Sequence, residues 1–112
     1  MARKFKSSTT SGKRILLIDD NREYIEATKK LLSNEGHDVA VAANGKEALE
    51  LLQEEYYDLV LVDYYMPGMT GEEMVTRLRE FNPIIQVILQ TGYVDEQPPR
   101  ELIRRLDIQG YY

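Results

Sequence analysis

The sequence predicts an α/β protein in which helices cover both faces of a parallel sheet. Short aliphatic runs alternate along the chain with segments whose apolar residues recur at helical spacing. The aliphatic runs contain few polar residues, which is typical of strands buried on both faces. At 112 residues, with 43% hydrophobic residues, the chain is long enough for one domain with a core. No internal repeat and no second domain are visible.

The predicted strands are short aliphatic runs bounded by polar or turn residues. They cover residues 15–19, 38–43, 59–63 and 84–91, and the closing IQGYY has the pattern of the start of a fifth strand. Pro83 separates the fourth strand from the helix before it. Because right-handed crossovers are required between parallel strands, only a few doubly wound strand orders remain.

Helices are predicted for residues 21–36, 45–56, 71–81 and 100–106. Asp20 or Asn21 can cap the first helix, Asn44 can cap the second, and Gly36 is a stop signal. The apolar stripes expected to face the core are Ile25, Thr28, Leu31 and Leu32 in the first helix, Ala48, Leu51, Leu52 and Glu55 in the second, and Met74, Leu78 and Phe81 in the third.

Charge is distributed unevenly. The net charge is −5, but residues 1–14 contain five basic residues and no acid, so the rest of the chain has a net charge of −10. Such an acidic body repels nucleic acid, and we expect no DNA or RNA binding by this domain. Residues 1–13 are expected to form a flexible basic tail or linker and residues 14–112 the folded domain.

The expected cellular compartment is inferred from three features that the sequence does not contain. There is no signal peptide and no apolar run near the roughly 20 residues that span a bilayer, so no membrane association is expected. The absence of cysteine fits a reducing compartment, and we expect a cytoplasmic protein.

Acidic residues end two of the predicted strands. Asp19 and Asp20 end the first strand and Asp63 ends the third. In parallel sheets, ligands bind at the carboxyl ends of the strands where the strand order reverses. If the first and third strands are neighbours, as in the order 2-1-3-4-5, the three carboxylates converge. An all-oxygen site of this kind suits Mg²⁺ better than zinc or copper, and such an ion supports phosphoryl transfer.

Two other segments could complete this site. The fourth strand ends on Thr91, whose hydroxyl could donate to an oxygen of a group attached to Asp63. The Pro67-Gly68 turn shapes the loop after Asp63, and backbone carbonyls of that loop are possible additional metal ligands. Simple turn chemistry explains Pro67 and Gly68 equally well. A single strand-terminal carboxylate is also most often a helix cap or a solvated turn.

Together these motifs resemble the receiver domain of two-component response regulators. The matching segments are ILLIDD, LVLVDYYMPGMTG and VILQTG, and the resemblance covers residues 14–112. It implies the flavodoxin-like strand order 2-1-3-4-5. It also implies a signalling module that accepts a phosphoryl group from a histidine kinase or phosphotransfer protein, and not a metabolic enzyme.

The resemblance also implies residue roles. Asp63 would be the phosphoacceptor, with Asp20 binding Mg²⁺ directly and Asp19 through water. The resemblance further assigns the backbone carbonyl of Tyr65 as a metal ligand, Thr91 as the residue that moves toward the phosphoryl group, and Tyr111 as the coupled switch aromatic.

The sequence departs from the family pattern at its end. Receivers have a lysine at the end of the fifth strand and a fifth helix, and this sequence stops at Tyr112 before either. We therefore expect a receiver truncated within its fifth strand and lacking the last helix, either a fragment or a shortened form. Loss of that helix would uncover one sheet face, so self-association or exchange of elements between chains is expected.

Two alternative functions remain open. One is a pseudo-receiver that keeps the fold as a scaffolding or dimerisation module without being phosphorylated. The other is a flavodoxin-like cofactor binder, disfavoured because the acidic DDNRE follows the first strand where phosphate binding needs glycines and amides.

Tyrosines and methionines surround the predicted site. The tyrosines Tyr64, Tyr65, Tyr93, Tyr111 and Tyr112 fall near strand ends, where they could form a rim or an aromatic docking face. Tyr65 could also shield a phosphoryl group from water. Met66 and Met69 are expected to pack within the loop, and His37 to be an ordinary surface residue.

Overall fold

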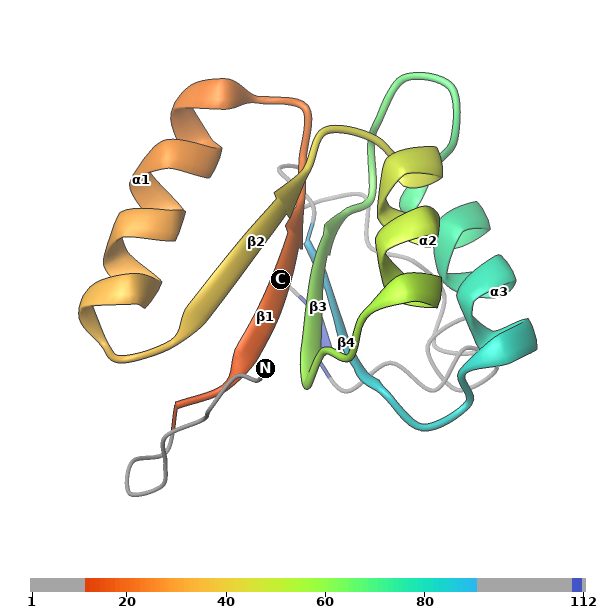
Figure 1. Cartoon of the computed structure of the whole chain (residues 1–112). Helices are drawn as coiled ribbons and strands as arrows, with labels where there is room; N and C mark the ends of the chain where they lie inside the picture. The colour runs from red at the N-terminus through yellow and green to blue at the C-terminus, as the bar shows by residue number, and fades with distance from the viewer. Residues whose placement is uncertain (1–11, 91–109, 112) are drawn as a thin grey trace.

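The computed structural model describes residues 12–90 and 110–111, which form a parallel sheet with three helices (Figure 1). The elements, in chain order, are β1 (Arg14–Ile18), α1 (Arg22–Asn34), β2 (Asp38–Ala42), α2 (Gly45–Glu54), β3 (Leu59–Asp63), α3 (Gly71–Phe81), β4 (Gln86–Gln90) and β5 (Gly110–Tyr111). The sheet order is β2-β1-β3-β4-β5, with every neighbouring pair parallel. The predicted α/β class and the strand order 2-1-3-4-5 are confirmed.

The two faces of the sheet are covered by different helices. In Figure 1, α1 lies on one side of the strands, and α2 and α3 lie side by side on the other. Side chains alternate along each strand, so Leu16 and Ile18 belong to the α2–α3 core while Ile15 and Leu17 belong to the cluster under α1. Continuing this alternation, Asp19 falls on the α1 face.

Polar caps set where the helices begin. The Asn21 side chain accepts from the Tyr24 backbone N–H, which identifies Asn21, and not Asp20, as the cap of α1. Asn44 caps α2, and Thr70 forms a reciprocal capping box with Glu73 at α3.

The predicted helical stripes are correct in part. Leu52, Ala48, Met74 and Leu78 are buried, but Leu31 is 63% exposed and Phe81 39% exposed. Glu55 is also exposed, because α2 ends at Glu54. Leu31 lies at the flank of α1, where Ile25 and Leu32 make the contacts with the sheet. Val75, which the stripe omitted, is fully buried.

Three strands differ from the prediction by one or two residues. β1 runs from Arg14 to Ile18, one residue earlier at each end than predicted. β4 begins at Gln86, two residues later than expected, because residues Asn82 to Ile85 form a turn in which the Asn82 side chain accepts from the N–H groups of Ile84 and Ile85. Ile84 is consequently 82% exposed. β2 ends at Ala42, one residue early.

Arg14 fixes the amino end of β1. Its backbone N–H donates to Asp58 Oδ2 (2.7 Å), its guanidinium pairs with Glu55 (2.5 Å), and it lies over the Tyr57 ring at 4.6 Å. The domain start predicted at residue 14 thus coincides with the first strand residue. The basic tail, apart from Gly12 and Lys13, and the predicted helix at 100–106 lie outside the described residues.

Among residues 12–90 and 110–111, no helix is long and apolar enough to cross a membrane.

Candidate functional site

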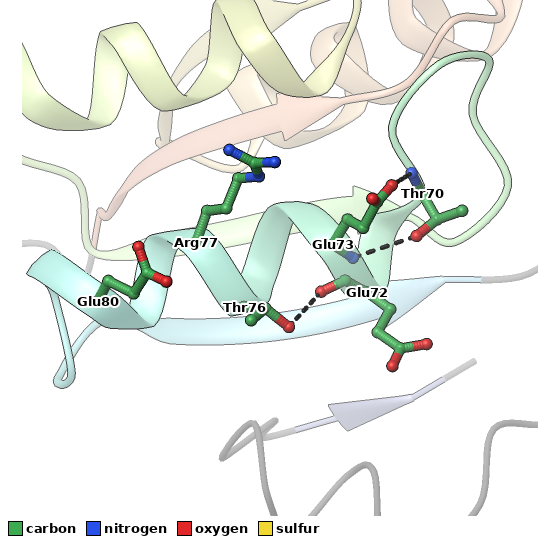
Figure 2. Close-up of a pocket in the computed structure, with 6 residues that line it drawn as sticks. All are labelled: Thr70, Glu72, Glu73, Thr76, Arg77 and Glu80. Carbon is green, nitrogen blue, oxygen red and sulfur yellow. Dashed lines mark hydrogen bonds between the residues drawn. The ribbon is translucent and has the colours of Figure 1, made fainter.

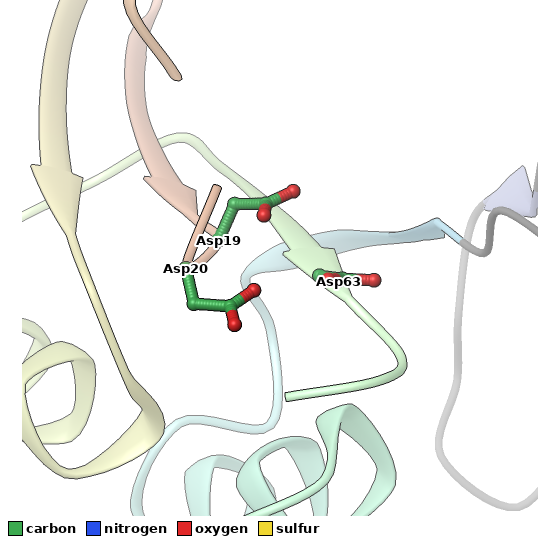
Figure 3. A group of neighbouring side chains, drawn as sticks. All are labelled: Asp19, Asp20 and Asp63. Atoms are coloured by element: carbon green, nitrogen blue, oxygen red, sulfur yellow. The ribbon is translucent and has the colours of Figure 1, made fainter. Parts of the chain in front are cut away.

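The three predicted carboxylates come together at the carboxyl ends of two neighbouring strands (Figure 3). Asp63 is the last residue of β3, and Asp19 directly follows β1. Since Ile18 of β1 is paired with Val62 of β3, Asp19 and Asp63 are brought side by side. One oxygen from each of Asp19, Asp20 and Asp63 can be chosen so that all lie within 4.8 Å of one another.

Backbone groups hold two of these carboxylates in place. Asp19 Oδ1 accepts from the Asn21 N–H at 2.9 Å, and Asp63 Oδ1 accepts from the Tyr65 N–H at 3.2 Å. Asp19 is buried, Asp63 is half-buried and Asp20 is exposed. The cluster therefore has one face open to solvent, through which a ligand can enter.

Mutual repulsion and burial make this cluster costly to ionise. Burial, followed by the charge of Asp19, raises the pKa of Asp63 from 3.8 to about 6. Burial also raises the pKa of Asp19. A cation between the carboxylates would remove this penalty.

The donor set fits Mg²⁺. It consists only of oxygens, it is close enough to share one ion, and its open face leaves room for the water ligands that Mg²⁺ retains. Zinc and copper prefer imidazole or thiolate ligands, which the cluster lacks.

The loop after Asp63 is mostly exposed and is anchored to the core by two methionines. Gly68 adopts a positive φ of 85°, which permits the turn after Pro67, and Met66 is buried. Met69 is partly buried against the core. Met66 and Met69, which were predicted to pack within the loop, contact the core cluster.

Tyr64 and Tyr65 form an edge-to-face pair beside the cluster. Their ring centroids are 4.7 Å apart with an interplanar angle of 89°. Tyr65 is 37% exposed and Tyr64 is half-buried. Two of the expected rim tyrosines are therefore found at the site; the roles of the Tyr65 carbonyl and ring stay predictions.

The remaining predicted site residues fall toward the end of the chain. Thr91, Tyr93 and Tyr112 lie outside the described residues. Tyr111 belongs to β5, where its backbone is paired with Leu89 of β4.

His37, expected to be an ordinary surface residue, is partly buried. Its Nδ1 accepts from the Lys13 backbone N–H at 3.0 Å, at the opposite end of the sheet from the carboxylates. This hydrogen bond gives His37 a structural role next to the start of β1.

A shallow hollow lies elsewhere, along the outer side of α3 (Figure 2). The described residues that line it are Thr70, Glu72, Glu73, Thr76, Arg77 and Glu80. Figure 2 draws the capping box between Thr70 and Glu73 and the bond from Thr76 Oγ1 to the Glu72 carbonyl (2.8 Å). Asp19, Asp20 and Asp63 do not line this hollow. The cluster that these three aspartates form is the better candidate for chemistry.

Sequence reasoning missed two residues at the site. The Tyr24 hydroxyl, on the first turn of α1, donates to Gln90 Oε1 at the end of β4 (2.9 Å). Gln90 is paired directly with Asp63 in the sheet. A polar residue at the end of an otherwise aliphatic strand was the available signal, but its partner could not be found without the helix orientation.

With this geometry established, comparison with known proteins defines the class. Residues 15–111 match the family model of the response regulator receiver domain, and the chain belongs to this family of two-component signalling domains. It is 39% identical over 82 residues to a response regulator receiver protein of Anaeromyxobacter, covering 73% of this chain and 34% of that protein. It is 36% identical over 95 residues to the receiver protein CpdR of Brucella abortus, covering 80% and 79%.

A solved structure gives the same result. The response regulator TrrA of Thermotoga maritima, in complex with Mg²⁺-BeF, is 34% identical, with a TM-score of 0.78, and the match covers 88% of this chain and 84% of that one. TrrA has also been solved in complex with the histidine kinase ThkA. The chain spans only about a third of the length of the Anaeromyxobacter relative.

Proposed function

We propose that this chain accepts a phosphoryl group on Asp63 with Mg²⁺ as cofactor and uses the new charge to switch a partner-binding face. The observation behind the proposal is the convergence of Asp19, Asp20 and Asp63 within 4.8 Å at the carboxyl ends of β1 and β3. The receiver family membership and the Mg²⁺-BeF complex of TrrA support it.

Asp63 would act as the nucleophile. Its ionised carboxylate would attack the phosphorus of a phosphohistidine, so that a P–O bond forms as the P–N bond breaks. The departing imidazole nitrogen keeps the electron pair of the broken bond and takes a proton from water. Bound Mg²⁺ would neutralise charge on the transferred group. Asp20 and Asp19 would hold the ion, together with the Tyr65 carbonyl. Thr91 would donate to the phosphoryl oxygens, with Tyr111 as the coupled aromatic.

The phosphoryl donor would be a histidine kinase or a phosphotransfer protein. The complex of TrrA with ThkA supports a kinase as donor. The chain would not turn over an external substrate, and its chemistry would be limited to its own phosphorylation and dephosphorylation. A cytoplasmic location fits this partner, and the acidic body fits the expectation that the domain does not bind nucleic acid.

Intact mass after incubation with Mg²⁺ and a small phosphodonor tests the proposal. We expect one phosphoryl adduct on the parent and none on Asp63→Asn. Asp58→Asn is the matched control, because Asp58 lies at the other end of β3 and its contact with the Arg14 N–H needs only a carbonyl oxygen. An adduct on Asp63→Asn, or none on a folded parent, would contradict it. The second outcome would favour a pseudo-receiver that acts as a scaffold.

Self-association, expected from the sequence, stays a prediction. On the α1 face, Leu59 of β3 and Ile88 of β4 are only partly buried. Light scattering over a range of concentrations checks it, and a monomer throughout would contradict it.

A further inference from the structure

A hydrogen bond connects α1 to the end of β4, the strand next to Asp63. Tyr24, on the first turn of α1, donates its hydroxyl to Gln90 Oε1 at 2.9 Å, although the residues are 66 positions apart. The Tyr24 ring packs on the apolar cluster beneath α1. The ring is thus held by packing, and its hydroxyl reaches across to the end of β4.

Each end of this bond continues to a carboxylate. On the α1 side, the Tyr24 N–H donates to Asn21 Oδ1 (3.0 Å), and the Asn21 N–H donates to Asp19 Oδ1 (2.9 Å). On the β4 side, the backbone carbonyl of Gln90 accepts a hydrogen bond from the Tyr64 N–H at 2.6 Å. Tyr64 directly follows Asp63, and Gln90 is the sheet partner of Asp63.

We propose that Tyr24 and Gln90 are positioning residues, which couple the aspartate pair after β1 to Asp63 through this path. The inference rests on the proposed function. It adds that the first turn of α1 and the end of β4 move as one unit, so that a change at one carboxylate alters the position of the other. Neither residue touches the reacting atoms.

The expected size of the effect follows from the strength of one hydrogen bond. A net contribution of 0.5–1.5 kcal/mol corresponds to roughly a 2- to 13-fold change in an equilibrium constant. Only part of this change would appear in the Mg²⁺ affinity or in the rate of adduct formation. We therefore expect Tyr24→Phe, which keeps the ring, to weaken Mg²⁺ binding and slow adduct formation by about 2- to 5-fold.

A double-mutant cycle tests the coupling. Tyr24→Phe and Gln90→Met each remove one partner while preserving bulk, and the double variant removes both. The control is Tyr56→Phe, which removes an exposed hydroxyl bonded to Asp58 at the opposite end of the sheet. Mg²⁺ affinity, the rate of phosphoryl adduct formation and hydrogen exchange at the Tyr64 amide are measured on all four variants and the parent.

If the coupling is real, the double variant matches either single variant in Mg²⁺ affinity and adduct rate, and Tyr24→Phe speeds exchange at the Tyr64 amide. The inference would be overturned if the effects of the two single substitutions multiply in the double variant. It would also be overturned if Tyr24→Phe changes these quantities no more than Tyr56→Phe does. Exchange is read on the metal-free chain, so it decides the coupling even if the parent takes no phosphoryl group. A folded parent that takes no phosphoryl group would count against the proposed function only, and not against the coupling.

Discussion

Gly71 lies so close to Asp63 that a Cβ on Gly71 would be 2.6 Å from the Asp63 carbonyl oxygen and 2.9 Å from the Tyr64 Cα. Both atoms belong to the backbone that presents the acceptor. The Gly71 N–H also donates to the Tyr64 carbonyl at 2.9 Å. The first residue of α3 therefore fixes the path of the chain just after the acceptor, and only glycine permits this approach.

Gly71→Ala should destabilise the fold and displace the acceptor, because the obstructing atoms cannot rotate away. We expect the free energy of unfolding in urea to fall by about 1–3 kcal/mol. Gly45→Ala is the matched control at the start of α2, where the added Cβ would meet only the flexible Met69 side chain. An equal or larger loss for Gly45→Ala would contradict this account.

Asp63 should make the metal-free protein less stable as the pH rises. Its pKa is about 6 in the folded state and 3.8 ordinarily, so the folded state binds more protons between these values. Stability therefore falls as the pH rises from about 4 to about 6, and stays lower above that range. Asp63→Asn should raise the free energy of unfolding by about 1–2 kcal/mol at neutral pH with a chelator present, allowing for solvent screening.

The pH dependence of that gain is the control. Urea unfolding at several pH values should show the difference between Asp63→Asn and the parent shrinking toward pH 4. A difference that is constant with pH would mean that the Asp63 charge is not its cause.

Mg²⁺ should stabilise the parent through the acidic cluster. At about ten times its dissociation constant, a ligand specific for the folded state adds about 1.4 kcal/mol. Asp20→Asn should lose most of this gain, and Glu23→Gln, an exposed acid on the first turn of α1, should keep it. Thermal unfolding with and without Mg²⁺ measures both. Equal losses in the two variants would indicate nonspecific binding to a negative surface.

Tyr65 should slow the loss of phosphate. Its ring belongs to the loop that follows the acceptor and is held edge-to-face against Tyr64. Replacing it with serine should open the site to water and speed hydrolysis of the adduct, which a time course of intact mass would record. Tyr56→Ser is the control, since Tyr56 is 72% exposed and bonded to Asp58. Unchanged or slower loss in Tyr65→Ser would reject the shielding role.

Local sequence signals were sufficient for the parallel sheet and for the carboxylates at its edge, whereas the strand order 2-1-3-4-5 came from the resemblance to receiver domains. The aliphatic runs end on Asp19 and Asp63, and a parallel sheet necessarily gathers such ends at one edge. Helical spacing could not place Leu31, because a helix beside a flat sheet buries a narrower stripe than its apolar residues suggest.

Contacts between residues far apart in the chain could not be predicted from the sequence for a different reason. The bond between Tyr24 and Gln90 depends on how α1 is rotated over the sheet, which neither segment specifies alone. The approach of Gly71 to Asp63 likewise depends on the packing of α3. Such contacts are decided by tertiary structure.

The most direct test of the central claim is to locate the phosphoryl group. After incubation with Mg²⁺ and a small phosphodonor, borohydride reduces an aspartyl phosphate to homoserine, and peptide sequencing by mass spectrometry identifies the position. Homoserine at position 63, absent when Mg²⁺ is chelated, is the result we predict. Homoserine at another aspartate, or none in the folded protein, would contradict the assignment of Asp63 as the acceptor.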